Sequence, residues 1–249
     1  MNGSEFSRLP GMPIQLFRRT TLLSEPRTIS LLTEVIHLPA VQPPEKLREV
    51  YNEVCRTCGY ENFTRIQGGA RIERREPEGE GLSQLTFLGD RIQFTEDHTG
   101  ASVDQFGKKI LAVLSTALPA LSIPLILVQQ TTVRVTATPN SFRSASEYLA
   151  RSLFRIQGDD LQPLGRPASV FGFRLVLPAT AQHPHNFNVR VECYVRDGRS
   201  LYIENVGTFK APIQPSTISE VEKNLHLTAD YLGENVFKFL SLFDRKESE

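Results

Sequence analysis

Hydrophobic residues in this chain recur with two different spacings. Stretches with a hydrophobic residue at every second position are typical of strands that bury one face, and stretches with a spacing of three or four are typical of amphipathic helices. In the first part of the chain the spacing predicts a strand at 28–38, a helix at about 44–58, strands at about 63–74, 82–88 and 91–95, and a helix from about 103. Pro119 and Pro124 are expected to end this last helix.

The second part of the chain repeats this order of elements. The spacing predicts a strand at 125–137, a helix from about 144, strands at 170–177, 187–196 and 201–209, and a long helix at 218–243. Both parts therefore read β-α-β(3)-α, which is an internal repeat of pattern and not of residues. We expect an α+β fold in which two tandem halves, 12–119 and 120–249, form one globule with antiparallel sheets and long helices packed across them.

One stretch without charge, Ile110–Val133, raises the question of a membrane span. A span needs about 20 apolar residues in unbroken helix. Pro119 and Pro124 interrupt the stretch, and each removes a backbone donor and disfavours helix. We therefore predict a helix, a turn and a buried strand here. The protein is expected to be soluble, with no membrane partner.

Local signals set several boundaries. Ser102 and Gln105, like Ser144 and Glu147, have the spacing of a capping box. Gly89-Asp90 predicts a two-residue hairpin turn. A three-residue loop with Gly198 in a left-handed bulge is expected between the strands at 187–196 and 201–209.

The C-terminal helix is expected to be capped by Thr217 and Glu220. Its apolar positions follow the helical period and predict one buried stripe: Val221, Leu225, Ala229, Leu232, Val236 and Leu240.

Composition narrows the class of protein. The 28 basic and 28 acidic residues balance to a formal net charge of zero, which argues against a nucleic-acid partner because phosphate binding depends on basic charge. Three cysteines are too few for a disulfide framework and indicate a reducing, cytoplasmic setting. Residues 1–11 resemble a vector-encoded remnant of cloning, with Met12 as the expected natural start.

Cys55 and Cys58, followed by Gly59, form the sharpest short motif. They could be a redox pair, or half of a zinc site completed by Cys193 with His183 or His185, or small core residues. The motif lies at a helix C-terminus, where the helix dipole opposes a thiolate, and Gly59 fits a helix cap. We therefore predict a structural role and no metal or other cofactor.

The doubled layout resembles TATA-binding-protein-like and helix-grip folds, in which a long helix lies across a curved antiparallel sheet. The terminal helix carries Leu225, His226 and Ala229, and the strand TTVRVTATPN carries Arg134 and Asn140. These residues also resemble a sporadically distributed, uncharacterised family of bacterial proteins of about this size. In that family the strand ends in Tyr-Ile-Asn, whereas here no Tyr-Ile precedes Asn140. The resemblance implies a fold and no activity.

The sequence contains no Gly-rich phosphate loop, no G-x-S-x-G elbow and no H-E-x-x-H motif. We therefore interpret the protein as a non-enzymatic binding or interaction protein. Its partner would be a protein, bound at the polar outer face of the strand at 187–196 through Arg190, Tyr194 and Arg196.

Two alternatives stay open. The first is a small apolar ligand held between the sheet and the C-terminal helix by Phe171, Phe173, Leu232 and Val236. The second is an enzyme whose catalytic residues are dispersed along the chain.

Overall fold

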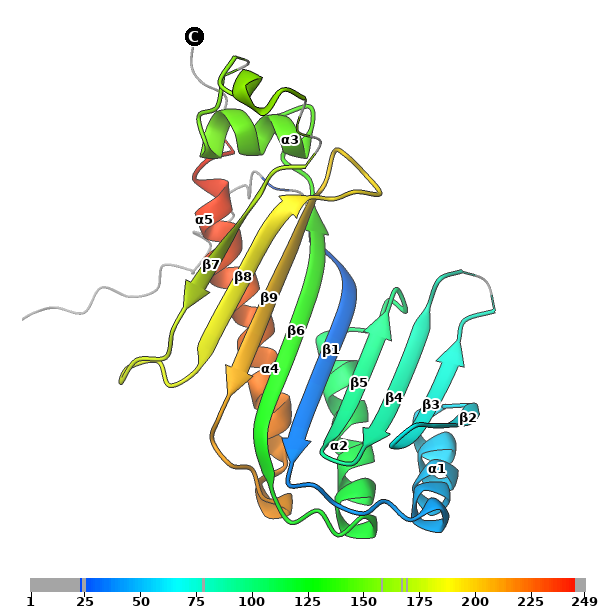
Figure 1. Ribbon diagram of the computed structural model, residues 1–249. Coiled ribbons are helices and arrows are strands. Elements are labelled where there is room, and N and C mark those ends of the chain that lie inside the picture. The colour runs from blue at the N-terminus through cyan, green and yellow to red at the C-terminus, as the bar shows by residue number, and fades with distance from the viewer. Residues whose placement is uncertain are drawn as a thin grey trace, which may run out of the picture.

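The computed structural model describes Leu23 and residues 26–77, 79–157, 159–166, 168 and 170–244. It is an α+β fold built on one antiparallel sheet of nine strands, in the order β2-β3-β4-β5-β1-β6-β9-β8-β7 (Figure 1). The strands are β1 (Arg27–His37), β2 (Asn62–Ile66), β3 (Gly69–Arg75), β4 (Leu82–Leu88), β5 (Arg91–Asp97), β6 (Ile126–Ala137), β7 (Gly172–Leu177), β8 (Asn186–Cys193) and β9 (Leu201–Phe209). The expected cloning remnant at 1–11 lies outside the described residues.

The long helices cover one face of the sheet (Figure 1). They are α1 (Pro44–Cys58), α2 (Val103–Ala120) and α4 (Ser219–Tyr231), and α2 packs between the other two. The short helix α3 (Ala145–Glu147) runs into a π-helical turn and lies at one end of the sheet (Figure 1). In the part of the chain that the structure describes, no helix crosses the opposite face, which we call the open face.

The pair formed by β1 and β6 joins the two sides of the sheet. The pairing runs from Arg27 opposite Thr136 to His37 opposite Ile126. Thr33 lies opposite Thr131, and their buried hydroxyls are 3.1 Å apart. The next pair on the same face, Leu31 and Val133, is buried against the helices. The predicted strand at 125–137 is thus the neighbour of the central strand β1, and β9, β8 and β7 extend the sheet from it.

The uncharged stretch is a helix, a turn and a strand, as predicted. Ser102 caps α2 by accepting a hydrogen bond from the Gln105 backbone N–H, and the Gln105 side chain completes the capping box. The helix ends at Ala120, one residue after Pro119. None of the described helices has both the length and the hydrophobicity to cross a bilayer.

The predicted hairpin at Gly89-Asp90 is confirmed. Leu88 pairs with Arg91, so these two residues form the turn, and Leu85 and Phe87 lie opposite Phe94 and Ile92 on the buried face.

The predicted single strand at 63–74 is wrong, because this segment is the hairpin of β2 and β3. Ile66 pairs with Gly69, and Gly68 adopts a φ of 79° in the turn. A left-handed conformation is open to glycine at no steric cost, so the Gly68-Gly69 pair was the signal for a turn.

The three-residue loop with Gly198 in a bulge is also wrong. Cys193 pairs with Leu201, so the loop comprises residues 194–200. Asp197 closes it by accepting hydrogen bonds from the Arg199 N–H and the Ser200 hydroxyl. The expected odd loop length is correct, and Ile203 consequently shares the buried face of Val191.

The C-terminal helix begins without the expected cap. The Thr217 hydroxyl instead accepts a hydrogen bond from the Gln214 backbone N–H in a 3₁₀ turn that precedes the helix. The residue immediately before α4 is Ile218, whose side chain cannot cap a helix. The helix then passes through a π-helical turn at Leu232–Val236 into α5 (Phe237–Ser241). The predicted stripe is largely buried despite this irregularity, with Ala229 only partly so.

Leu232 gives a direct test of this helix. Its side chain is only 2% exposed, so Leu232→Ala should lower the free energy of unfolding by about 2–5 kcal/mol, as large-to-small core changes do. The exposed Glu234 lies in the same turn and serves as the control, because Glu234→Ala should change stability by less than about 0.5 kcal/mol. Urea unfolding measures both, and equal effects would contradict the core assignment.

Candidate functional site

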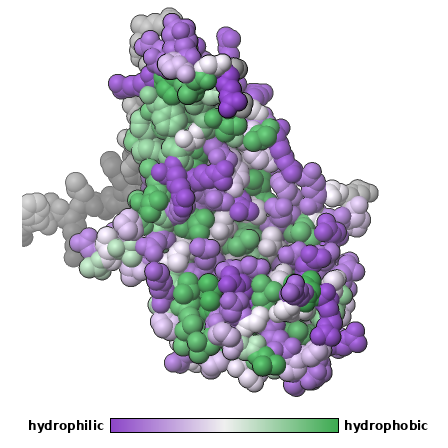
Figure 2. Space-filling model, in the orientation of Figure 1, coloured by the Kyte–Doolittle hydropathy of each residue, from purple (hydrophilic) through white to green (hydrophobic). Residues whose placement is uncertain are grey.

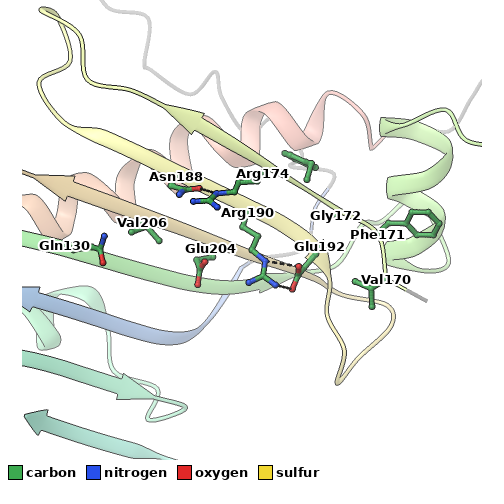
Figure 3. A pocket seen from close by; sticks show the side chains of 11 residues that line it. Gln130, Val170, Phe171, Gly172, Arg174, Asn188, Arg190, Glu192, Glu204 and Val206 are labelled. Carbon is green, nitrogen blue, oxygen red and sulfur yellow. Dashed lines mark hydrogen bonds and ion pairs between the residues drawn. The ribbon is translucent and has the colours of Figure 1, made fainter. Parts of the chain in front are cut away.

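The open face carries a groove of about 750 Å³ along β7, β8 and β9 (Figure 3). Hydrophilic and hydrophobic residues are mixed on this side of the molecule, and the hydrophobic ones gather where β7 approaches α3 (Figure 2). The lining residues are Gln130, Val170, Phe171, Gly172, Phe173, Arg174, Asn188, Arg190, Glu192, Glu204 and Val206.

Strand register places four charged residues in one row across this groove. Arg174 lies opposite Arg190, Arg190 opposite Glu204, and Glu204 opposite Arg134. Side chains directly opposite on neighbouring strands are close enough to interact. The row therefore works as one electrostatic unit of three cations and one anion.

Two of the three arginines are neutralised within the protein. Arg134 donates from Nε to Glu204 Oε2 at 2.7 Å, and Arg190 binds both oxygens of Glu192 at 2.8 and 2.7 Å (Figure 3). The hydrogen bonding that Arg190 donates to Glu192 raises the pKa of Arg190. Both guanidinium groups are therefore held in place by carboxylates.

Arg174 is different. Its Nε donates to the Asn188 amide oxygen at 2.6 Å, and among the described residues it has no carboxylate partner. It also faces the like-charged Arg190 across the strand pair, an arrangement that is unfavourable in itself. The groove thus holds one exposed cation that a bound carboxylate would stabilise.

An aromatic pair borders the charged row. The Tyr202 and Tyr194 rings stack with centroids 6.4 Å apart, and the Arg190 guanidinium lies 5.7 Å from the Tyr202 centroid. Burial, together with the Glu204 carboxylate, raises the pKa of Tyr202 to about 12. Its hydroxyl is therefore protonated at neutral pH and donates to Glu204 at 2.9 Å.

The structure brings two of the three predicted interaction residues together. Arg190 and Tyr194 both lie beside Tyr202. The expectation that Tyr194 and Arg196 lie on the strand face is wrong, because β8 ends at Cys193 and both belong to the loop at 194–200. Arg196 instead forms an ion pair with Glu80, between β3 and β4, and this contact lowers the pKa of Glu80.

The four predicted ligand-binding residues do not line one cavity. Phe171 and Phe173 belong to the segment that borders the groove on the open face, but Phe173 lies opposite the buried Val191, and its ring contacts Phe154 and Phe239 edge to face. Leu232 and Val236 are buried in the core, 2% and 6% exposed. An apolar pocket between sheet and helix does form, but farther towards the start of α4, around Leu227 and Tyr231.

A third group of polar side chains lies between the sheet and α2. Ser83 donates to Glu96 Oε1 at 2.7 Å, and the Lys109 ammonium donates to both residues. The Lys109 ammonium also lies 5.2 Å from the Tyr60 ring centroid. Burial, followed by the nearby Glu96 charge, raises the pKa of Tyr60. Because these groups bind one another, the cluster is best explained as a buried ion pair that anchors α2.

The metal-ligand candidates lie in separate parts of the fold. Cys55 and Cys58 are half-buried on α1, and Gly59 caps that helix with a φ of 70°, as predicted. His185 and Cys193 flank the two ends of β8, which spans eight residues and thus roughly 25 Å at about 3.3 Å per residue. Within the described ranges, no three His, Cys, Asp or Glu residues are grouped so that they could hold a metal ion.

Sequence reasoning missed Arg134, Arg174 and Glu204 as members of the site. Each occupies an outward position of a predicted strand, and that alternation was a visible signal. The missing information was the neighbour order, because nothing in the local pattern places β9 between β6 and β8.

Comparison of the chain with protein-family models finds no matching family, and comparison with curated proteins finds no match.

The buried pair beneath α2 can be tested with Glu96→Gln. Glu96 is 3% exposed, so its loss would leave the Lys109 charge poorly compensated, and we expect about 3–5 kcal/mol lower stability in chemical denaturation. Glu220→Gln, in the exposed pair with Lys223, is the matched control and should cost less than about 1 kcal/mol. Equal losses would mean that water screens the Glu96–Lys109 pair.

The structural role of the cysteines predicts that protein purified without chelator carries no stoichiometric zinc. Elemental analysis of the wild type and of Cys58→Ser should give the same metal content, because Cys58 packs against the core. Stoichiometric zinc in the wild type that disappears in the variant would contradict this role.

Proposed function

We propose that this protein is a non-enzymatic interaction protein whose open sheet face binds an extended, acidic segment of a protein partner. The observation that carries the proposal is Arg174, an exposed guanidinium in a groove, opposite a second arginine and without a carboxylate partner among the described residues. The proposal extends the sequence-based interpretation from Arg190 and Tyr194 to the whole charged row.

The shape of the groove favours an extended chain. It follows the direction of β7 and β8, and Val170 and Phe171 provide apolar contacts at the end where β7 begins, on the right in Figure 3. A partner segment could place a carboxylate at Arg174 and an apolar side chain beside Phe171. Arginine binds carboxylates with two parallel hydrogen bonds, which would fix the register of such a segment.

Two tandem halves are part of this proposal. The strand order is symmetric about the β1–β6 pair: β5 and β9 come next on either side, then β4 and β8, then β3 and β7, with β2 extra. This order supports the two-half interpretation and the likeness to TATA-binding-protein-like units. In functional terms, the halves would join their sheets edge to edge into one long binding face.

The setting we propose is the cytoplasm. The three cysteines are free thiols, which suits a reducing compartment.

Charge reversal on the open face tests the proposal. Immobilised wild-type protein should retain an acidic partner from extract, and Arg174→Glu should lose it, because the new carboxylate repels the bound one. Lys108→Glu makes the same charge change on an exposed position of α2, on the helix side, and should retain the partner.

Retention by both variants to the same degree would overturn the proposal, as would loss by both. Circular dichroism and urea unfolding of each variant establish that any loss comes from the surface and not from unfolding.

A further inference from the structure

A second pocket lies on the helix side of the sheet, apart from the charged row. It has a volume of about 620 Å³ and is formed by the connection between β7 and β8 on one side and the helical segment beginning with α4 on the other. Its lining residues are Leu177, Pro178, Thr180, His183, His185, Phe187, Leu227, Tyr231 and Asn235. This volume is in the usual range for small-molecule sites, about 300–1,000 Å³.

Stacked aromatic rings form one wall of the pocket. Phe187 and Tyr231 stack with centroids 4.3 Å apart and an interplanar angle of 22°. The His185 ring lies 4.9 Å from the Phe187 centroid and 5.4 Å from that of Phe209. Rings held against one another in this way give a preformed apolar wall.

The close packing behind this wall depends on a glycine. Gly207 lies opposite Phe187 on the neighbouring strand, and a Cβ there would come within 2.4 Å of the Thr228 hydroxyl and 2.9 Å of the Phe209 ring. Glycine therefore lets α4 approach the sheet closely. This approach brings Tyr231 onto Phe187.

The pocket carries neither acidic nor permanently basic side chains among its described lining residues. Its polar side-chain groups are two hydroxyls, an amide and two imidazoles, from Thr180, Tyr231, Asn235, His183 and His185. Burial, with the neighbouring His183 as a lesser cause, lowers the pKa of His185 below its usual value, so this ring is neutral at neutral pH. A charged ligand would lose its hydration here without gaining an opposite charge.

An exposed apolar residue stands at the mouth. Leu227 on α4 is 42% exposed, whereas Val221, Leu225 and Thr228 on the same helix are buried. Together with Leu177 and Pro178 it makes a concave apolar surface that water covers poorly.

We propose that this pocket binds a small, neutral, planar molecule, aromatic or polycyclic, that stacks against Phe187 and Tyr231 and hydrogen-bonds to the imidazole and amide groups at the rim. The site lies away from Arg174, so it is independent of the partner-binding groove. It also replaces Phe171, Phe173, Leu232 and Val236 as the lining of a ligand site between sheet and helix.

The neutral probe N-phenyl-1-naphthylamine tests the site, because its fluorescence rises when it enters an apolar environment. The protein has no tryptophan, so the background is low. Wild-type protein should bind the probe saturably. Leu227→Asp, which puts a charge at the mouth, should raise the dissociation constant at least tenfold.

Leu242→Asp is the matched control, because Leu242 is 59% exposed beyond α5 and outside the pocket lining, and it should bind as the wild type does. Asn235→Trp is a second pocket variant that fills the mouth from an exposed position, and it should also weaken binding at least tenfold.

Absence of saturable binding by the wild type overturns the proposal. So does equal affinity of Leu227→Asp and Leu242→Asp, or undiminished binding by a folded Asn235→Trp variant.

Discussion

The pairing of β1 with β6 is the constraint on which the rest of the fold depends. The two strands are separated by almost the whole first part of the chain, yet they must meet in one register to make the sheet continuous. Each then directs a different set of strands outward, β5 to β2 from β1 and β9 to β7 from β6. A slip of one residue between β1 and β6 would turn either Leu31 or Val133 away from the helices and break the core.

Buried polar groups fix how α4 sits on this sheet. Gln129 on β6 donates to the Val221 carbonyl and accepts from the Asn224 amide, both at 2.9 Å, and Asn205 on β9 donates to the Thr228 carbonyl at 2.9 Å. Apolar packing alone would allow the helix to slide, whereas these bonds are satisfied in one position only. The apolar pocket at Tyr231 and the core at Leu232 both follow from that position.

The elements of this fold could be predicted from local signals, but their neighbours could not. The Ser102 cap of α2 and the turn at Gly89-Asp90 depend on residues close in sequence, and both predictions are confirmed. The errors lie in local turns that a residue pattern leaves ambiguous. Asp197 shapes the loop at 194–200 by bonding to Ser200, and Gln214 rather than a helix cap engages Thr217, each across only three residues. The charged row likewise depends on strand order, so a single sequence could suggest Arg190 but not its alignment with Arg134, Glu204 and Arg174.

Arg174 has one more consequence, because it is the only charged residue of β7, and β7 is an edge of the sheet. An edge strand offers unpaired backbone groups to any other strand it meets, and here Leu175 and Val176 beside Arg174 are exposed and apolar. When two copies of the chain approach edge to edge, their arginines repel and keep the backbones apart. The same charge that would attract an acidic partner would therefore also oppose pairing of this edge with a second copy of the sheet.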